Sequence, residues 1–279
     1  MPTFNRSAVL TRCLKALIPQ VCDMGRDAEI IVVDDGSSPR EAERIAALAA
    51  SPGMMQIALC RHPVNRGVGA ARNTGAGKAA GGVIIFLDDD LAPGPGFVRG
   101  HLEVHLENPQ ILLLCGHLFT NARSMYARFW AHCYEQVFAR RQDTDPFPVP
   151  MLSSGNFSIR RAGLDLFRPL FDPELPSRED FDLYLRARDA GHMVYKTMRA
   201  GAELFPRETL PAFAAQRRWY AEGEIRLRQK YGRDTIMAAE EACPIQRTVE
   251  MRMLDAAVRM WNRIASRRTT ALNSRGDQG

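Results

Sequence analysis

The sequence predicts an α/β fold with a mainly parallel central sheet flanked by helices. Residues 29–38 and 83–90 each begin as an apolar, β-branched run and stop abruptly in aspartates or turn residues, which is typical of buried strands. Residues 39–50 and 69–80 suit helices, and strands that alternate with helices favour a parallel sheet. In such sheets, ligands bind beyond the carboxyl ends of the strands.

The rest of the chain predicts further elements. They are a third apolar run at 111–115, a helix at 124–141, a strand at 153–160, a helix at 180–190 with Gly191 as its C-cap, and helices after Pro211. No apolar run precedes the loop that begins at Pro2, although an open parallel sheet normally starts with one. The start of the chain is therefore expected to be truncated or wrongly assigned.

The composition indicates a globular protein without selecting its partner. Of the 279 residues, 46% are hydrophobic and 25% are charged. The net charge of +5 suits a partner that carries phosphate, whether a nucleotide, a lipid diphosphate, an anionic membrane or a nucleic acid. The six cysteines lack the spacing of a zinc site. With no signal-peptide stretch and no apolar run of membrane-spanning length, a cytoplasmic location is the expectation.

Aspartates end the first two predicted strands. They are Asp34, Asp35, Asp88, Asp89 and Asp90. So much like charge at one sheet edge is costly unless a divalent cation or a group of arginines neutralises it. Oxygen ligands in an Asp-x-Asp spacing suit Mg²⁺ or Mn²⁺, with diphosphate oxygens filling other positions. For either group of aspartates alone, solvated turn residues are an equally good interpretation.

Four short motifs follow one another along the first part of the chain. They are Pro-Thr-Phe-Asn-Arg at 2–6, Val-Asp-Asp-Gly-Ser at 33–37, Asn-Arg-Gly at 65–67 with Ala-Arg-Asn-Thr-Gly at 71–75, and Phe-Leu-Asp-Asp-Asp at 86–90. In order, spacing and strand context, they resemble family 2 glycosyltransferases with the GT-A fold. The resemblance covers about residues 1–235. It implies a nucleotide-binding half at about 1–120 and an acceptor half at about 121–235.

The resemblance implies roles on the donor side. The loop at 2–6 and Asp35 would hold the nucleoside, and Asp34 would support the turn. Asp90 is the expected metal ligand together with Asp88, while Asp88 or Asp89 would contact the ribose and Asp89 alone could be a spectator. The candidate donor-binding residues are Pro2, Thr3, Phe4, Arg6, Asp34, Asp35, Arg72, Asp88 and Asp89.

The resemblance also extends to the acceptor side. In the strand at 153–160, Gly155 would let backbone approach the sugar and Asn156 would bond hydroxyls, although a plain strand with a bulge at Gly155 is an equal alternative. Residues 177–187 resemble the motif that supplies the catalytic base. Asp180 would take the proton of the acceptor hydroxyl, and Glu179 would orient Asp180 or raise its pKa. Taken alone, these residues also suit an acidic helix N-terminus.

The C-terminal part offers weaker signals. Residues 215–219 resemble the Gln-x-x-Arg-Trp motif of processive family members, with the spacing one residue short. Arg217, Arg218 and Trp219 are candidates for contact with the diphosphate or the acceptor, and a solvated basic helix face is at least as good an interpretation. Residues 251–268 are amphipathic, which favours packing on the same domain or a dimer partner over a membrane surface. The unassigned histidines are expected to be structural: His101, His105, His117, His132 and His192.

The sequence thus predicts an inverting glycosyltransferase that uses Mn²⁺ or Mg²⁺. The donor is a nucleotide-diphosphate sugar, with uridine diphosphate expected from family frequency. The acceptor is a hydroxyl of a glycan, a lipid-linked molecule or another compound, and the location is cytoplasmic or peripheral on the cytoplasmic membrane face. Amphipathic helices at 236–268 and a disordered tail at 269–279 follow the domain. The alternative is a non-catalytic nucleotide-sugar-binding or scaffold protein; no motif for reading nucleic acid is recognised.

Overall fold

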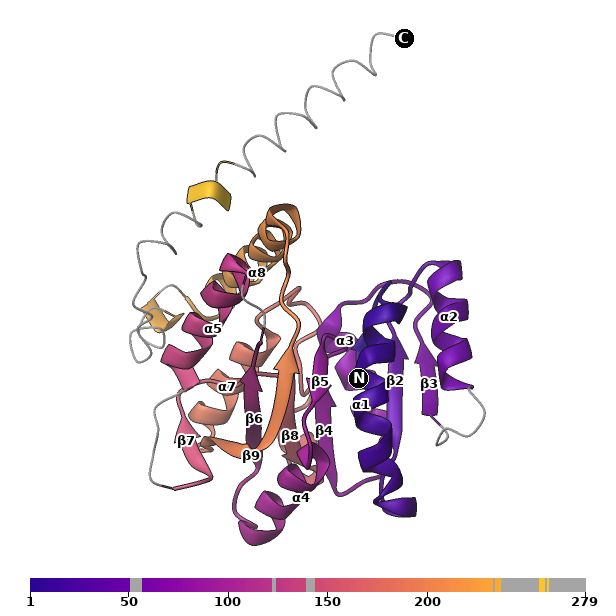
Figure 1. The fold of residues 1–279 in the computed structure, drawn as a ribbon. Helices are drawn as coiled ribbons and strands as arrows, with labels where there is room; N and C mark the ends of the chain where they lie inside the picture. Colours follow the sequence, from indigo (N-terminus) through magenta and orange to yellow (C-terminus); the bar gives the residue numbers. More distant parts are fainter. Residues whose placement is uncertain are drawn as a thin grey trace.

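A computed structural model describes residues 1–50, 57–121, 124–138, 144–232, 234–236, 256–258 and 260. Figure 1 shows sheets with helices packed around them, so the predicted α/β class is confirmed. The bounds predicted for the helices at 39–50, 69–80 and 180–190 agree with the observed bounds to within two residues at each end.

The first sheet is parallel, as predicted. Its strands are β1 (Pro2–Thr3), β2 (Ile30–Asp34) and β3 (Ile57–Arg61), in that order. Its helices are α1 (Ser7–Cys22), the short 3₁₀ helix η1 (Gly25–Asp27), α2 (Pro39–Ala49) and α3 (Val68–Lys78). β1 consists of the first residues of the predicted loop. Pro2 pairs with Val33, and the amino group of Met1 donates a hydrogen bond to the carbonyl of Ile31 at 2.9 Å.

The second sheet is mixed rather than mainly parallel. Its strands are β4 (Val83–Leu87), β5 (Leu91–Pro93), β6 (Leu113–Phe119), β7 (Phe147–Val149), β8 (Asn156–Arg160) and β9 (Val194–Leu204), in the order β4-β8-β6-β9-β5 with β7 beside β9. Only β6 and β9 pair in parallel. β8 starts at the end where β4 stops, since Asp88 N donates to Gly155 O, and so it must run back along β4.

Further helices cover the second sheet. They are α4 (Phe97–Glu107), α5 (Met125–Phe138), α6 (Arg161–Leu166), α7 (Glu179–Asp189) and α8 (Leu210–Tyr231). One apolar core joins α1, β2 and β4 to β6 and β8. Within it, the rings of Phe86 and Phe157 stack at 5.6 Å and Phe171 meets Phe86 edge-on at 5.3 Å. The carboxyl end of β4 is thereby fixed on a rigid base.

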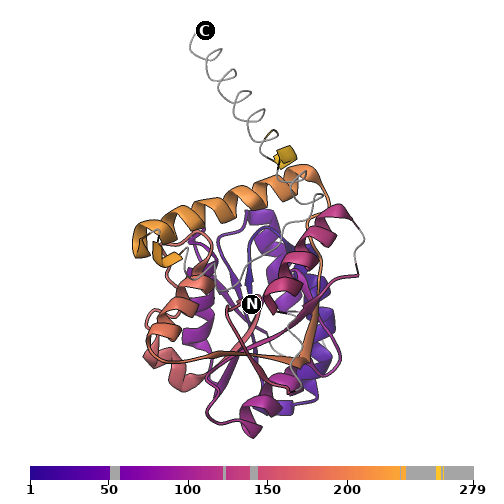
Figure 2. The ribbon, with the colours of Figure 1, turned by 90° about the vertical axis from the view of Figure 1, so that its left-hand side faces the viewer.

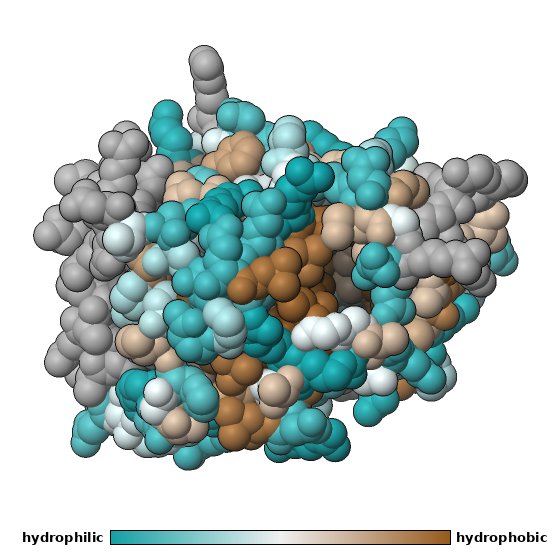
Figure 3. All heavy atoms as spheres, turned by 90° about the horizontal axis from the view of Figure 1, so that it is seen from below, coloured by the Kyte–Doolittle hydropathy of each residue, from teal (hydrophilic) through white to brown (hydrophobic). Residues whose placement is uncertain are grey.

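α8 lies across one end of the fold, as Figure 2 shows. Thr209 caps it by accepting a hydrogen bond from Ala212 N, and Pro211 stands in its first turn. The opposite end carries apolar side chains around a hollow (Figure 3). Within the described residues, none of the helices combines the length and the apolar character that crossing a membrane requires.

Most of the predicted helices at 236–268, and the whole predicted tail at 269–279, lie outside the described residues. Val258, one of the few described there, is 6% exposed and packs with Phe129 of α5 and Phe213 of α8. This contact agrees with packing of the segment on its own domain.

Candidate active site

The predicted carboxylates of the two halves meet at one edge of the second sheet. Asp88 and Asp90 follow β4, whereas Glu179 and Asp180 open α7. Gly155 lies against Asp88, because a Cβ at this glycine would stand 3.0 Å from Asp88 Oδ2. In this structure the close neighbour of Gly155 is thus a carboxylate of the protein, and approach of its backbone to a sugar stays a prediction. We call the following residues the carboxylate cluster: Asp88, Asp89, Asp90, Glu179 and Asp180.

Arg72 joins the two parts of the carboxylate cluster. Its guanidinium forms an ion pair with Asp88 at 2.5 Å and a second ion pair with Glu179, which is 107 residues away in the sequence. The side chain of Arg72 is only 2% exposed. In the absence of ligand, Arg72 therefore positions these carboxylates, and contact with a nucleotide would require it to exchange a partner.

Asp180 is the more accessible member of the acidic pair on α7. Glu179 is 4% exposed and also accepts a hydrogen bond from Ser154 Oγ at 3.2 Å. Asp180 is half-buried, and its two carboxylate oxygens accept from the backbone N–H groups of Phe181 at 2.8 Å and Ser154 at 3.5 Å. Acidic residues in a first turn are stabilised by the helix dipole. Glu179 is thus held as a structural partner of Arg72, and Asp180 is the more exposed of the two carboxylates.

Arg6 ties the predicted nucleoside loop to the carboxylate cluster. It pairs with Asp89 at 2.8 Å and with Asp90 at 3.1 Å. Thr3 Oγ1 donates to the other carboxylate oxygen of Asp89 at 2.8 Å. Both oxygens of Asp89 are therefore used by the protein, so Asp89 positions the loop at 2–6 and does not face a ribose in this structure.

Several arginines lie near the carboxylate cluster. Arg6 and Arg72 form ion pairs with it, and Arg207 and Arg178 interact electrostatically with Asp90 and Asp180, respectively. Burial is the main reason that the pKa values of four members are raised, and neighbouring carboxylates raise them further against the arginines. The pKa is raised to about 7 for Asp89 and Glu179, and is also raised for Asp90 and Asp180. A bound cation would offset both the burial of these carboxylates and their mutual repulsion.

Asp88 and Asp90 fit a partial set of ligands for Mg²⁺ or Mn²⁺. Among the residues that the structure describes, no three or more His, Cys, Asp or Glu side chains are grouped to hold a metal. Mg²⁺ is usually bound by one or two carboxylates, with water and substrate phosphates filling the other positions. The pair supplies such a partial set, which a diphosphate would complete.

The loop at 2–6 is shaped by the turn that follows β2. Asn5 has a φ of 54°, and its N–H donates to Ser37 Oγ at 2.8 Å while its side chain accepts from Ser38 N at 2.8 Å. The neighbouring ring of Phe4 is 41% exposed. Asp34 Oδ1 accepts from Ser37 N at 3.0 Å, so it supports the turn as predicted.

Asp35 does not face an open site, in contrast to the prediction. It is 3% exposed, and its carboxylate accepts from Arg66 N at 3.0 Å and Gly67 N at 2.9 Å. It also lies 2.6 Å from Nδ1 of His62, whose Nε2 contacts Thr74 Oγ1. Buried acceptors are normally satisfied in this way. Asp35 therefore fixes the loop before α3 together with His62. No motif in the sequence pointed to this role of His62.

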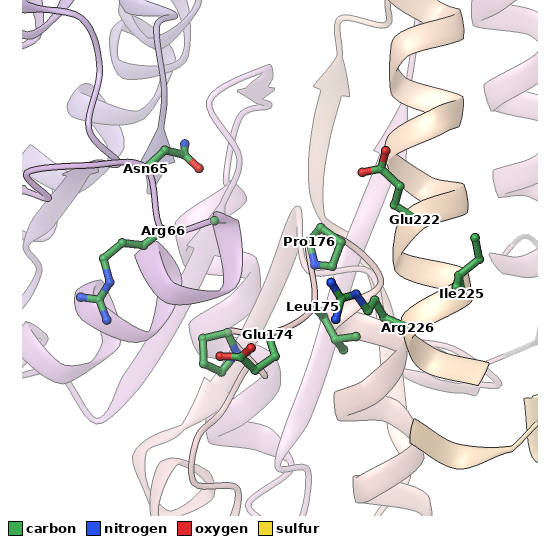
Figure 4. A pocket seen from close by; sticks show the side chains of 10 residues that line it. Asn65, Arg66, Glu174, Leu175, Pro176, Glu222, Ile225 and Arg226 are labelled. Carbon is green, nitrogen blue, oxygen red and sulfur yellow. The ribbon is translucent and has the colours of Figure 1, made fainter. Parts of the chain in front are cut away.

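A pocket of about 490 Å³ lies beside this loop (Figure 4). Figure 4 shows Asn65 and Arg66 on one side and Glu222 and Arg226 of α8 on the other. Its lining comprises Asn65, Arg66, Gly67, Pro173, Glu174, Leu175, Pro176, Glu222, Ile225 and Arg226. The volume is in the range of small-molecule sites.

Asn156 is part of the protein interior, which corrects its assignment to the acceptor. Its side chain is 0% exposed and donates to the carbonyls of Ala200 and His117 at 2.9 and 3.2 Å. Its Oδ1 lies 2.8 Å from His101 Nε2. Because successive strand residues point to opposite faces, the start of β8 beside Asp88 turns this side chain inward.

His101 and His105 complete that interior group. Ser158 Oγ lies 2.9 Å from His101 Nδ1 and 2.9 Å from His105 Nε2, and His105 Nδ1 lies 3.2 Å from the carbonyl of Ile111. Burial lowers the pKa of both imidazoles to about 4, so they are neutral near pH 7. We call His101, His105, Asn156 and Ser158 the histidine network. Its contacts agree with the predicted structural role of these histidines.

The three candidates on α8 point to different surroundings. Trp219 is 37% exposed, and its carbonyl accepts from Ser177 Oγ at 2.8 Å, two residues before Glu179. The Arg217 guanidinium lies 5.4 Å from the ring centroid of Phe129 on α5. Arg218 is exposed. The backbone of Trp219 is therefore held at Ser177, three residues before the candidate base Asp180, while Arg217 packs on α5.

Comparisons with known proteins agree with this fold and motif order. The solved structure of residues 1–349 of TarS from S. aureus superposes with a TM-score of 0.56 over 79% of this chain and 63% of that chain, at 20% sequence identity. That likeness concerns the fold, which is of the GT-A type.

Curated relatives match parts of the chain. An uncharacterised glycosyltransferase YfnE of Bacillus subtilis is 30% identical over 49% of this chain. An undecaprenyl-phosphate 4-deoxy-4-formamido-L-arabinose transferase of Edwardsiella ictaluri is 36% identical over 34%, and a pre-mycofactocin glycosyltransferase of Mycobacterium tuberculosis is 27% identical over 68%. The matches cover 34%, 29% and 38% of these relatives, respectively.

The sequence profile of glycosyl transferase family 2 matches residues 1–167. This range contains the loop at 2–6, the aspartates after β2 and β4, Arg72 and Gly155. The match covers more than half of the chain and agrees with the fold, so the chain belongs to glycosyl transferase family 2.

Proposed function

We propose that the protein is an inverting glycosyltransferase that moves a sugar from a nucleotide-diphosphate donor to an acceptor hydroxyl. The observation that carries the proposal is the junction made by Arg72, which holds Asp88 beside Glu179 and hence the expected metal-binding aspartates beside the expected base. A single displacement requires this arrangement, with a base on one side of the anomeric carbon and a stabilised leaving group on the other.

In the proposed reaction, Asp180 acts on the acceptor. Its carboxylate takes the proton of the acceptor hydroxyl while the hydroxyl oxygen forms a bond to the anomeric carbon. The bond from that carbon to the diphosphate breaks at the same time, and the diphosphate keeps the electron pair. Glu179 stays bound to Arg72 and holds the start of α7, so that Asp180 is directed at the acceptor.

Asp88 and Asp90 are proposed to hold Mn²⁺ or Mg²⁺ against the diphosphate. A bound divalent ion neutralises charge that develops on the leaving group. The burial and mutual repulsion of the carboxylates, which a cation would offset, support this role. Arg6, held by Asp89 and Asp90, stands at the same place and is suited to phosphate by its planar guanidinium.

The nucleoside is proposed to bind between the loop at 2–6 and the pocket beside Arg66. The exposed ring of Phe4 offers an apolar surface, and Asp35 contributes by fixing the loop at 65–67. Uridine diphosphate remains the expected nucleotide of the donor. Two relatives are named an undecaprenyl-phosphate 4-deoxy-4-formamido-L-arabinose transferase and a pre-mycofactocin glycosyltransferase, so both a lipid-linked and a non-lipid acceptor are compatible with the family.

The proposed transferase domain spans residues 1–235, with the nucleotide-binding half at about 1–120. A peripheral membrane contact or a homodimer through residues 236–268 remains a prediction, as does the cytoplasmic location. These proposals concern the chain as a whole and do not affect the site.

Binding of nucleotide diphosphates with and without Mn²⁺ tests the proposed function. A ligand that binds only the folded protein at a hundred times its Kd stabilises it by about 2.7 kcal/mol. We expect one nucleoside diphosphate to raise the melting temperature only with Mn²⁺, and Asp90→Asn to abolish the metal effect. Stabilisation by no nucleotide, or equal stabilisation without metal and in Asp90→Asn, would contradict the proposal. Nucleotide binding without sugar transfer to any acceptor would favour the non-catalytic alternative.

A further inference from the structure

α8 is fixed against the start of α7 by several contacts. Ser177 Oγ donates to the carbonyl of Trp219 at 2.8 Å, and Arg178 pairs with Glu224 at 3.0 Å. Gly223 packs so closely on Ser177 that a Cβ there would stand 2.2 Å from the serine hydroxyl. These contacts lie directly before Glu179, so one face of α8 is held next to the carboxylate cluster.

The far end of α8 is fixed as well. Tyr231 Oη and Lys230 Nζ lie 2.7 and 2.6 Å from Asp182 Oδ1, and Asp182 is fully buried on α7. A helix held at several points along its length keeps one rotation about its axis. The residues that α8 turns toward α7 are therefore determined by the helical period of about 100° per residue.

Tyr220 lies in the middle of that inner face. The helical period places it in one stripe with Phe213, Gly223 and Leu227, all of which are buried. Tyr220 is nevertheless 37% exposed, and its ring lies 5.1 Å from that of Trp219. Its neighbours Trp219 and Gly223 both contact Ser177, so Tyr220 lies on the part of α8 that packs beside the start of α7 and hence near Glu179 and Asp180.

The electrostatics of the Tyr220 hydroxyl agree with this position. Burial of the hydroxyl raises its pKa above the usual range, and the charges of carboxylates on both sides of the site raise it further. These carboxylates are Asp180, Glu179, Asp90 and Asp88. The hydroxyl is therefore protonated near pH 7, and it stands within the field of both the expected base and the expected metal ligands. In a single displacement, the transferred sugar occupies the space between these two groups.

We propose that the Tyr220 hydroxyl donates a hydrogen bond to a hydroxyl group of the transferred sugar and thereby contributes to donor specificity. This inference rests on the proposed function. Carboxylates can only accept hydrogen bonds, and the site's arginines Arg6 and Arg72 are held in ion pairs. An uncharged phenol supplies a donor to the sugar without adding to the charge that faces the diphosphate.

Tyr220→Phe tests the inference because it removes the hydroxyl and keeps the ring. We expect the affinity for the intact nucleotide sugar to fall about three- to tenfold, as for loss of one hydrogen bond, with the affinity for the nucleoside diphosphate unchanged. Calorimetric titration with Mn²⁺ measures both. A donor analogue that lacks the contacted sugar hydroxyl should bind the parent and Tyr220→Phe equally. Tyr195→Phe is the matched control, because Tyr195 packs on the α4 side against Val104, Ile111 and Leu114.

The outcomes separate the inference from the proposed function. If the parent protein binds no nucleoside diphosphate, the proposed function fails. If it does bind, three results overturn the role of Tyr220: unchanged affinity for the nucleotide sugar, an equal loss for the diphosphate and the nucleotide sugar, or a change confined to the KM of the acceptor. A Tyr220→Phe protein that has a lower melting temperature and binds neither the diphosphate nor the nucleotide sugar would show that the hydroxyl is structural. That result would also overturn the proposed role of Tyr220.

Discussion

The carboxylate cluster lies beside the start of β8 and the histidine network extends along β8 from Asn156 to Ser158, and the two groups differ in how their polar groups are satisfied. In the histidine network, each of the four side chains has neutral partners within hydrogen-bonding distance. In the carboxylate cluster, Arg6 and Arg72 form ion pairs with four of the five acidic residues, and burial with repulsion between carboxylates raises the pKa of Asp89 and Glu179 to about 7. A satisfied neutral group stabilises the fold, whereas an incompletely neutralised charged group is suited to a ligand that completes it.

The largest expected effect tests the cluster as a catalytic group. Asp180→Asn should lower kcat by about 10²- to 10⁴-fold, because the amide cannot take the acceptor proton. The melting temperature should not fall, since one of several repelling charges is removed. Steady-state kinetics with nucleotide binding as control measure both. Near-parent turnover would remove Asp180 from the role of base, and lost nucleotide binding would indicate disruption of the site.

Asn156→Ala tests the network as a structural group. It removes the side chain that bonds His101 and two carbonyls in a fully buried place, so the free energy of unfolding should fall by about 3 kcal/mol. Chemical denaturation measures it. The exposed Asn121, bonded only to Glu203 among the contacts described for it, provides the control, and Asn121→Ala should change stability by less than about 0.5 kcal/mol. Parent-like stability with a raised acceptor KM would restore the acceptor assignment.

The example of Asn156 shows why the sequence predicted the place of the site better than the roles within it. Strand ends rich in aspartate, the motif order and the acidic start of α7 are local signals, and the structure joins two of the residues they singled out, Asp88 and Glu179, through Arg72. The direction of a strand side chain depends on its neighbours, so the inward turn of Asn156 was not predictable. The capture of Asp35 by the loop at 65–67 likewise depends on contacts between distant segments.

α8 shows a second limit of prediction from the sequence. The spacing of residues 215–219 drew attention to Trp219, but nothing local indicated that Tyr220 faces the carboxylates. That follows from Ser177, Gly223 and Glu224, which fix the rotation of the helix. The direction of β8 was also missed, because a reversal of chain direction leaves the apolar pattern of a strand unchanged.

The pH dependence of stability should distinguish the two groups by sign. The folded-state pKa of His101 is lowered from 6.5 to about 4, so protonation opposes folding, and stability present above pH 6.5 is lost as the pH falls toward 4. For Asp89 and Glu179, whose pKa values are raised to about 7, acidification over the same interval favours the folded state. The stability advantage of the parent over His101→Gln should therefore shrink by about 2 kcal/mol between pH 7 and pH 5. Denaturation at both pH values measures it, and a constant difference would contradict the neutral buried imidazole.

The smallest effect is expected at Asp89, which is as buried as members of the histidine network but belongs to the charged group. Asp89→Asn keeps an acceptor for Thr3 Oγ1 and loses the ion pair with Arg6, while repulsion from Asp88 and Asp90 is relieved. These opposing terms should leave the free energy of unfolding within about 1 kcal/mol of the parent. Denaturation measured beside Asn156→Ala gives the comparison. A loss as large as that of Asn156→Ala would mean that the arginines already neutralise the cluster, and the argument for a bound cation would lose its electrostatic basis.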